Sequence, residues 1–305
     1  MNREAKELDV LRAGFDEIAP GIHVYMTGNT GPNSTAIVSG GEVMLIDALM
    51  TTKQSARFKA ALAEVTDWPV TKLAYSHRHG DHVLGAEVFG DIPAVFGSPS
   101  TVDFLRTVGD DYMEIYAQWR RTPEDAADVR AIQHVVRPNI AVESTLEVWA
   151  GDVRVRLLRQ EFGHSPSDML VLLPDHGILC TGDVYAPRIV PGMRDGRAAG
   201  WLDRLQEIYD MDPQIIVPGH GPWSRDRYFV QELRDFLATA YDATQAGIAA
   251  GEQPEQILER IDQDEWKVFH GMKRYPEVIG RMFEELEDRP SKYDQVLEAA
   301  RAKAS

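Results

Sequence analysis

Short runs of apolar and β-branched residues, separated by turns that contain glycine, predict two groups of β-strands. In the first group, strands are predicted over residues 22–26, 34–38, 43–47, 70–75 and 94–96, with Gly40-Gly41 as the turn between the second and the third. In the second group, strands are predicted over residues 146–149, 153–158, 169–173, 178–180 and 215–217, with hairpin turns at 151–152 and 175–177. Helical spacing over residues 52–65 and 83–89 places helices among the first strands. The pattern indicates a protein that mixes strands and helices throughout most of its length.

Two further regions are predicted to be helical. Residues 99 to about 132 form a charged insertion that is long for a simple crossover between strands. From about residue 225 onward, helices are predicted over 225–249, 253–263, 275–287 and 291–303, punctuated by Gly251, Pro254, Pro276 and Pro290. We therefore predict a main domain over residues 1–223 and an α-helical C-terminal extension over residues 224–305. The extension is either a small subdomain or a layer packed on the main domain, and the sequence leaves both open.

The composition limits the classes of function. A chain of 305 residues with 44% hydrophobic residues can bury a full core. Its formal net charge of -16 argues against nucleic acid and anionic membranes as partners, because both require clustered lysine and arginine. The single Cys180 excludes an internal disulfide and a zinc module built from several cysteines. A small-molecule substrate is the expected partner, and a homo-oligomer is compatible with the sequence.

The sequence gives no sign of export or membrane insertion. Residues Met1 to Glu7 are polar and charged, and lack the apolar run and the cleavage site of a signal peptide. No stretch approaches the roughly 18 apolar residues of a membrane span. We therefore expect a cytoplasmic protein.

Seven side chains that can bind metal stand directly after predicted strands. Four of them, His77, His79, Asp81 and His82, follow the strand at 70–75, whereas His164, Asp183 and His220 lie far apart and are each preceded by glycine. A sheet would present all seven along one edge. Imidazole and carboxylate ligands suit zinc, and also iron, cobalt or manganese. The sequence therefore predicts a site for two divalent cations.

These residues also carry a resemblance. The sequence contains four motifs in this order: H-x-H-x-D-H at 77–82, Gly163-His164, Gly182-Asp183 and residues 218–221. Metallohydrolases of the metallo-β-lactamase fold have the same order, and the chain resembles that superfamily over about residues 20–223. The resemblance implies an α/β (α+β) fold, an αββα sandwich of two mixed β-sheets flanked by helices. It also implies two metal ions, with zinc as the first choice. In this match the ligands of the first metal are His77, His79 and His164, those of the second are Asp81, His82 and His220, Asp183 bridges the two, and Asp47 supports the ligands.

The resemblance implies a dinuclear metallohydrolase that uses a metal-bridging hydroxide to cleave a small ester, a lactone or another acyl substrate. Asp81 would also orient the nucleophile. Tyr185 is a candidate for a hydrogen bond to a substrate oxygen, with a packing role as its alternative. Arg78, inside the cluster, is either a charge at the edge of the site or a surface residue.

Several other activities stay open. A glutathione thioesterase would need basic side chains, for which Lys267, Lys273 and Arg274 are the local candidates. A lactonase would need an apolar pocket, which Phe104, Tyr112, Met113, Tyr116 and Trp119 could line, although helix packing explains them as well. Hydrolysis of β-lactams or phosphotriesters, a mononuclear iron dioxygenase and a non-catalytic metal-bound effector or binding protein are further alternatives. We set aside alkylsulfatases, because such relatives carry glutamates in the later ligand motifs.

Overall fold

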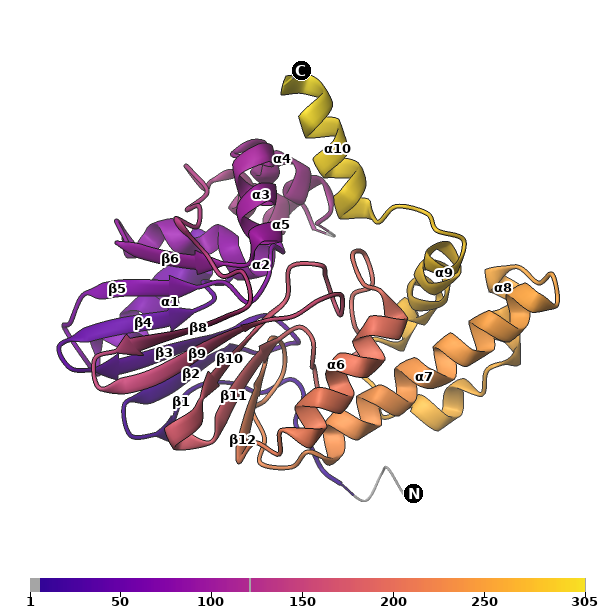
Figure 1. Cartoon of the computed structure of the whole chain (residues 1–305), viewed down its shortest axis with the longest axis horizontal. Helices are drawn as coiled ribbons and strands as arrows, with labels where there is room; N and C mark the ends of the chain where they lie inside the picture. Colours follow the sequence, from indigo (N-terminus) through magenta and orange to yellow (C-terminus); the bar gives the residue numbers. More distant parts are fainter. Residues whose placement is uncertain (1–5, 121, 305) are drawn as a thin grey trace.

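Two β-sheets lie face to face in the computed structural model, which describes residues 6–120 and 122–304, and helices cover both outer faces (Figure 1). The first sheet has the order β1 (Ala13–Ala19), β2 (Ile22–Thr27), β3 (Asn33–Ser39), β4 (Glu42–Ile46), β5 (Val70–Ala74), β6 (Ala94–Gly97) and β7 (Ile140–Ala141). Strands β1 to β4 are antiparallel, and β4 to β7 are parallel. The first sheet is therefore mixed, as predicted.

The second sheet has five strands in the order β12 (Ile215–Pro218), β11 (Ile178–Gly182), β10 (Met169–Leu173), β9 (Val153–Arg159) and β8 (Thr145–Ala150). Its strands are antiparallel except for the pair β11 and β12, which is parallel. The αββα sandwich predicted from the resemblance is confirmed.

Three apolar layers hold the sandwich together. Between the sheets, Val24 and Ile46 of the first sheet pack with Leu157 and Val171 of the second. Outside the first sheet lie α1 (Thr52–Ala63), α2 (Gly80–Val83), the 3-10 helix η2 (Leu84–Phe89), α3 (Pro99–Val108), α4 (Asp111–Gln118) and α5 (Pro123–Arg130). Outside the second sheet lie α6 (Ala198–Asp210), α7 (Tyr228–Ala249) and α9 (Tyr275–Leu286). Burial of apolar surface on both faces of each sheet is the main force that stabilises this arrangement.

The predicted insertion at 99–132 contains the three helices α3 to α5. Two of them begin with a capping side chain followed by proline: Ser98 accepts from the backbone of Thr101, and Thr122 accepts from the backbone of Asp125. A side-chain cap satisfies a backbone N–H that the first helical turn leaves unpaired, and proline fits this turn because it has no N–H. The insertion therefore has well-defined helix starts.

The C-terminal helices form a layer on the sandwich. They are α7, α8 (Pro254–Arg260), α9 and α10 (Lys292–Ala304). Side chains of α7 and α9 share one apolar core with Leu170 and Leu179 of the second sheet, which decides between the two arrangements left open by the sequence. Helix α10 instead reaches the opposite group of helices, where Tyr293 and Leu297 join the core that contains Phe104 of α3 (Figure 1). The domain boundary at 223/224 stays a prediction.

Within the described residues, no helix combines the length and the apolar character that a membrane-spanning segment requires. Residues 1–5 of the polar N-terminal segment lie outside the described residues.

Candidate metal centre

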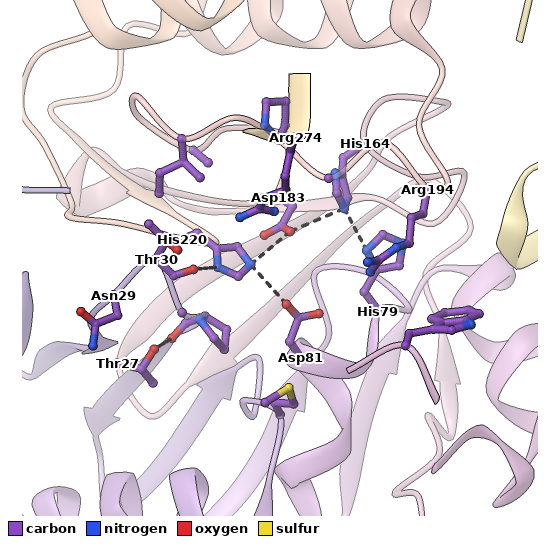
Figure 2. Close-up of a pocket in the computed structure, with 18 of the residues that line it drawn as sticks. Thr27, Asn29, Thr30, His79, Asp81, His164, Asp183, Arg194, His220 and Arg274 are labelled. Carbon is purple, nitrogen blue, oxygen red and sulfur yellow. Dashed lines mark hydrogen bonds and ion pairs between the residues drawn. The ribbon is translucent and has the colours of Figure 1, made fainter. Parts of the chain in front are cut away.

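The seven predicted residues meet at one edge of the sandwich, where strands of both sheets end. Figure 2 labels five of them: His79, Asp81, His164, Asp183 and His220. Residues 77–82 follow β5, His164 follows β9, Asp183 follows β11 and His220 follows β12. The carboxyl ends of parallel strands lie at the same edge of a sheet, and this brings Asp183 and His220 together after the parallel pair β11 and β12.

Glycine makes this close approach possible. A Cβ atom on Gly219 would lie 2.0 Å from Oδ1 of Asp183, closer than any side chain can come. Gly182 has φ +51°, in the left-handed region, and a Cβ atom there would lie 2.6 Å from the side chain of Ser76. The glycines that precede Asp183 and His220 are therefore required by the geometry of the loops.

The ligand atoms form two groups. In the first, His77, His79, His164 and Asp183 each offer one atom, and these atoms lie within 4.8 Å of one another; in the second, the same holds for Asp81, His82 and His220. Asp183 also reaches the second group, because its Oδ1 lies 3.2 Å from Nε2 of His82 and its Oδ2 lies 3.3 Å from Nε2 of His220. The two groups and the position of Asp183 between them have the arrangement that the resemblance implied.

Four of the five histidines are held through the nitrogen that faces away from the cluster. His77 Nδ1 lies 2.9 Å from Ser76 Oγ, His79 Nε2 lies 3.4 Å from Asp195 Oδ2, His82 Nδ1 lies 2.8 Å from Asp47 Oδ2, and His220 Nδ1 lies 2.8 Å from the carbonyl oxygen of Thr30. Partners of this kind fix the orientation and the tautomer of histidines that bind metal. Asp47 therefore has the supporting position expected for it.

The inward-facing atoms fit metal ions better than they fit one another. His164 Nε2 lies only 2.9 Å from His79 Nδ1, and His82 Nε2 lies 3.4 Å from His220 Nε2. Within the described part of the chain, His77 Nε2 and Asp183 Oδ1 are buried without a hydrogen-bond partner. A cation between converging lone pairs satisfies such atoms, so the residues present could hold one or two divalent metal ions.

Comparison with known proteins identifies the family. The sequence model described as the metallo-beta-lactamase superfamily matches residues 27–220, which is more than half of the chain. The chain belongs to this superfamily. Its resemblance in sequence is thereby confirmed, and all seven predicted site residues lie within the matched range or at its end.

Two curated relatives in the superfamily are alkylsulfatases. The chain is 21% identical over 253 residues to a linear primary-alkylsulfatase of Pseudomonas sp. (strain ATCC 19151), covering 72% of this chain and 48% of that protein. It is 25% identical over 267 residues to an (R)-specific secondary-alkylsulfatase of Pseudomonas sp., covering 74% of this chain and 40% of that protein. The chain thus spans half or less of the length of these relatives. The later ligand motifs of this chain contain no glutamate, but these matches show that this difference is not enough to set alkylsulfatases aside.

Solved structures share the fold. A stereoselective inverting sec-alkylsulfatase from Pseudomonas sp. matches with a TM-score of 0.71 at 18% identity, over 90% of this chain and 50% of that one. A metallo-beta-lactamase from Pontibacter korlensis matches with a TM-score of 0.57 at 16% identity, over 74% of this chain and 99% of that one. The alkylsulfatase fold therefore extends over a part of this chain that the lactamase fold does not cover.

Asp81 of the superfamily motif is oriented by the helical insertion. Tyr116 of α4 donates a hydrogen bond to Asp81 Oδ1 at 2.7 Å, and its hydroxyl oxygen accepts from the backbone N–H of Asp81 at 3.1 Å. The other carboxylate oxygen, Oδ2, lies 3.4 Å from Nε2 of His220. The sequence suggested Tyr116 as a possible pocket residue but not as a partner of Asp81, because the insertion lies outside the superfamily motifs.

The charges of the clustered histidines and aspartates depend on one another. Burial alone would raise the pKa of Asp183, but the neighbouring His220 and His82 hold it well below its usual range. Burial likewise opposes protonation of His220, but Asp183 and Asp81 raise its pKa to about 10. Asp183 is therefore anionic, the form that binds a cation, whereas His220 gives up its proton when a metal binds.

Two residues have positions that the sequence did not reveal. Tyr185 is fully buried in the apolar core beneath α6, together with Trp201, and is not among the described residues that line the cavity beside the cluster. The prediction that Tyr185 contacts substrate is therefore wrong, and packing is its role. Arg78 is neither at the surface nor at the edge of the site: it is 1% exposed and is paired with Asp195.

A cavity of about 550 Å³ opens beside the seven clustered residues, a size typical of small-molecule sites. His79, Asp81, His164, Asp183 and His220 line it, together with Met50, Tyr116, Trp119, Ile189, Val190, Pro191 and Tyr293. Three arginines, Arg120, Arg194 and Arg274, also line it, and Figure 2 shows Arg194 and Arg274 with the cluster. All five residues that we considered for a lactonase pocket belong to one apolar core or pack against it, and of these five only Tyr116 and Trp119 also line the cavity.

Proposed function

We propose that this chain is a metal-dependent hydrolase of an ester that carries an anionic headgroup and an apolar tail, with an alkyl sulfate ester as the first candidate. The observation that carries the proposal is the position of Asp183 between two groups of ligands at one side of a cavity. The names of two relatives, both alkylsulfatases, support the choice of substrate.

These ligands suit zinc, which is our first choice, and also iron, manganese or cobalt. Two such ions held by these groups would polarise the scissile ester and lower the pKa of a bound water. Asp183 holds the two groups of ligands at a fixed separation. Tyr116 orients Asp81, whose carboxylate would accept a hydrogen bond from the attacking water. His77, His79, His82 and His220 keep their orientation through partners outside the cluster.

The walls of the cavity favour an anionic ester. The guanidinium groups of Arg120, Arg194 and Arg274 can form charge-assisted hydrogen bonds to the oxygens of a sulfate or carboxylate group. Trp119, Ile189 and Val190 supply apolar surface for an alkyl chain. This combination binds a molecule with a charged end and an apolar end, whereas a neutral lactone or ester makes no use of three arginines.

Metal analysis and a substrate panel test the function. Purified chain is loaded with zinc, and its metal content is measured by inductively coupled plasma mass spectrometry together with that of His220→Ala. We expect two zinc ions per chain, falling toward one in the variant. The loaded protein is then given octyl sulfate, octyl acetate and an N-acyl homoserine lactone. Hydrolysis of octyl sulfate that is lost on chelation and restored by zinc supports the proposal.

Other results would contradict it. Turnover of octyl acetate or the lactone without turnover of octyl sulfate would replace the anionic ester with the neutral ester or lactone of our sequence analysis. Silence across the panel with two metals bound would favour the non-catalytic alternative. A reproducible single iron in the purified wild-type chain, measured before zinc is added, would favour the dioxygenase alternative.

The anionic headgroup predicts a selective effect of Arg194→Gln. A hydrogen bond to a charged group contributes about 1.5–3 kcal/mol, so we expect the KM for octyl sulfate to rise roughly tenfold or more. The kcat/KM for any neutral ester that the enzyme accepts should change less than about twofold, because no charge pairs with the arginine. Arg57→Gln, an exposed arginine of α1, is the matched control. Equal losses for charged and neutral substrates would show that Arg194 does not recognise the anion.

A further inference from the structure

The chain returns to the metal centre at the start of α10, far along the sequence from the histidine cluster. The ring of Tyr293 stacks on the imidazole of His79, with the ring centroids 4.3 Å apart and the planes 21° from parallel. Tyr293 is 1% exposed and lines the cavity. One face of a candidate metal ligand is therefore covered by the C-terminal helix.

A buried carboxylate joins the same turn of α10 to the same histidine. Asp195 accepts hydrogen bonds from Ser291 Oγ at 2.9 Å and from Arg78 Nε and Nη2 at 2.9 and 2.8 Å. Its Oδ2 also lies 3.4 Å from His79 Nε2. Arg78 reaches Asp294 of α10 as well, at 3.4 Å. The histidine motif and the start of α10 are therefore joined through the carboxylate of Asp195.

The network is tied to the backbone of the motif. Arg78 lies between His77 and His79, its N–H donates to Ser167 Oγ at 3.1 Å, and its carbonyl oxygen accepts from Tyr112 at 3.1 Å. An ion pair buried to this degree is costly to desolvate and costly to break, so its partners hold a defined geometry. A displacement of Ser291 or Tyr293 is therefore transmitted to His79 through Asp195 and through the ring stack.

We propose that residues 291–294, which are Ser291 and the first residues of α10, are a positioning part of the active site. Ser291 and Asp195 fix the orientation of His79, while Tyr293 covers its ring and forms the adjoining wall of the cavity. The effect on metal binding depends only on the ligand role of His79, whereas the effect on substrate rests on the proposed function.

Variants of the full chain test this role through zinc affinity, measured by competition with a chromophoric chelator. Changes in the partners of metal-binding histidines typically weaken metal affinity about 10–100-fold, which is the effect we expect for Asp195→Asn. Ser291→Ala and Tyr293→Leu act through one contact each, and we expect losses of at least about threefold. Tyr293→Phe keeps the ring, so it should restore the affinity to within about twofold of the wild type. Glu298→Gln, at an exposed position of the same helix, is the control.

Asp195→Asn weakens the pairing of the buried Arg78, so its folding is checked first by its thermal transition. If it does not fold, Ser291→Ala and Tyr293→Leu decide the question. Wild-type affinity in both, with or without a lower Tm, would overturn the positioning role. If the wild-type chain binds two zinc ions and all variants bind zinc with the same affinity, this inference alone is overturned. If the wild-type chain binds no zinc, the proposed function is overturned as well.

With octyl sulfate as the probe, Tyr293→Leu should also change the KM, because the residue forms part of the cavity wall. We expect a change of at least about threefold that Tyr293→Phe reverses. A loss in kcat alone, equal in both variants, would count against a role of the ring in binding substrate.

Discussion

At the scale of single residues, Asp183 has a closely constrained position between the two groups of candidate ligands. Its carboxylate lies within 3.5 Å of His82, His164 and His220, which come from three separate segments of the chain. Gly219 makes room for it, since any larger residue would collide with Oδ1. The charge of this one side chain faces both groups of candidate ligands.

Asp183→Asn should therefore affect both metal positions. The amide keeps the shape of the side chain but removes its negative charge, and an amide is a weaker zinc ligand than a carboxylate. We expect the zinc content to fall from two toward one or fewer per chain, and kcat for the substrate of the zinc-loaded enzyme to fall roughly 100-fold. Mass spectrometry of the metal and steady-state kinetics measure the two effects.

His134→Ala is the matched control for Asp183→Asn. The His134 side chain is 62% exposed, lies beside Glu87 and is not part of either ligand group. Its metal content should equal that of the wild type. Near-normal zinc and turnover in Asp183→Asn would remove the bridging role, and a metal lost from His134→Ala would show that a ligand was misassigned.

At the scale of elements, the pattern of apolar residues located most strands but only part of the site. Strands such as β4 and β5 are rich in valine, leucine and isoleucine, and their predicted bounds agree with the structure to within one or two residues. Strand β1 was not predicted, because its sequence AGFDEIA has few strand-favouring residues and it forms by pairing with β2. Helix α6 was also not assigned, although Trp201, Leu205 and Ile208 have helical spacing. The segment predicted as a helix over 83–89 is largely the 3-10 helix η2.

The motifs located the seven clustered residues, but they could not reveal the residues that support them. Asp195, Tyr116 and Tyr293 lie outside the motifs, and their contacts with the cluster depend on how distant segments pack. A neighbour in space that is distant in sequence leaves no local pattern. The aromatic residues of the insertion were noticed, but helix packing and cavity lining produce the same spacing.

A contact between the two sheets predicts that the stability of the protein depends on pH. Glu42 begins β4 and accepts hydrogen bonds from Lys72 Nζ at 2.6 Å and from the backbone N–H of Gly151, in the turn of the second sheet, at 2.7 Å. Burial alone would raise the pKa of Glu42, but the hydrogen bonds from Lys72, Thr71 and Gly151 lower it from 4.5 to about 2. The folded state therefore favours the carboxylate, and this contribution is present above pH 4.5 and lost as the pH falls toward 2.

Glu42→Gln should lower the free energy of unfolding by about 1 kcal/mol at pH 7, a typical value for one hydrogen-bonded group. The difference from the wild type should shrink as the pH falls below 4.5, because Glu42 of the unfolded chain then takes up a proton while the folded chain keeps the carboxylate charged. Urea unfolding at pH 7 and pH 3 measures it, with the exposed Glu298→Gln as control. A difference that stays constant over this range would show that the charge of Glu42 does not matter.

At the scale of the whole molecule, the candidate metal centre joins the two sheets. His77 and His82 follow a strand of the first sheet, whereas Asp183 and His220 follow strands of the second. Metal that binds only the folded chain stabilises it by about 4 kcal/mol when its free concentration is a thousand times the Kd. Because the ligands come from both halves of the sandwich, this stabilisation opposes the separation of the sheets.

Removal of metal should therefore lower the melting temperature. We expect a drop of roughly 10 °C after dialysis against a chelator, measured by differential scanning calorimetry and reversed by added zinc. Cys180 offers a second probe, because it is 3% exposed, and burial raises the pKa of its thiol to about 12. Its alkylation should accelerate in the metal-free chain. Equal Tm and alkylation rates with and without metal would show that the cluster contributes nothing to stability.

The order in which the chain is made has a consequence for its activity. Tyr293 stacks on His79, and the two residues lie 214 positions apart in the sequence. At about 5–20 residues per second, a ribosome needs roughly 10–40 s to make that stretch. The histidine cluster and both sheets thus leave the ribosome before the helix that closes one wall of the cavity. The candidate metal ligands can therefore come together before α10 is made, whereas the wall of the cavity that Tyr293 forms is complete only after α10 has left the ribosome.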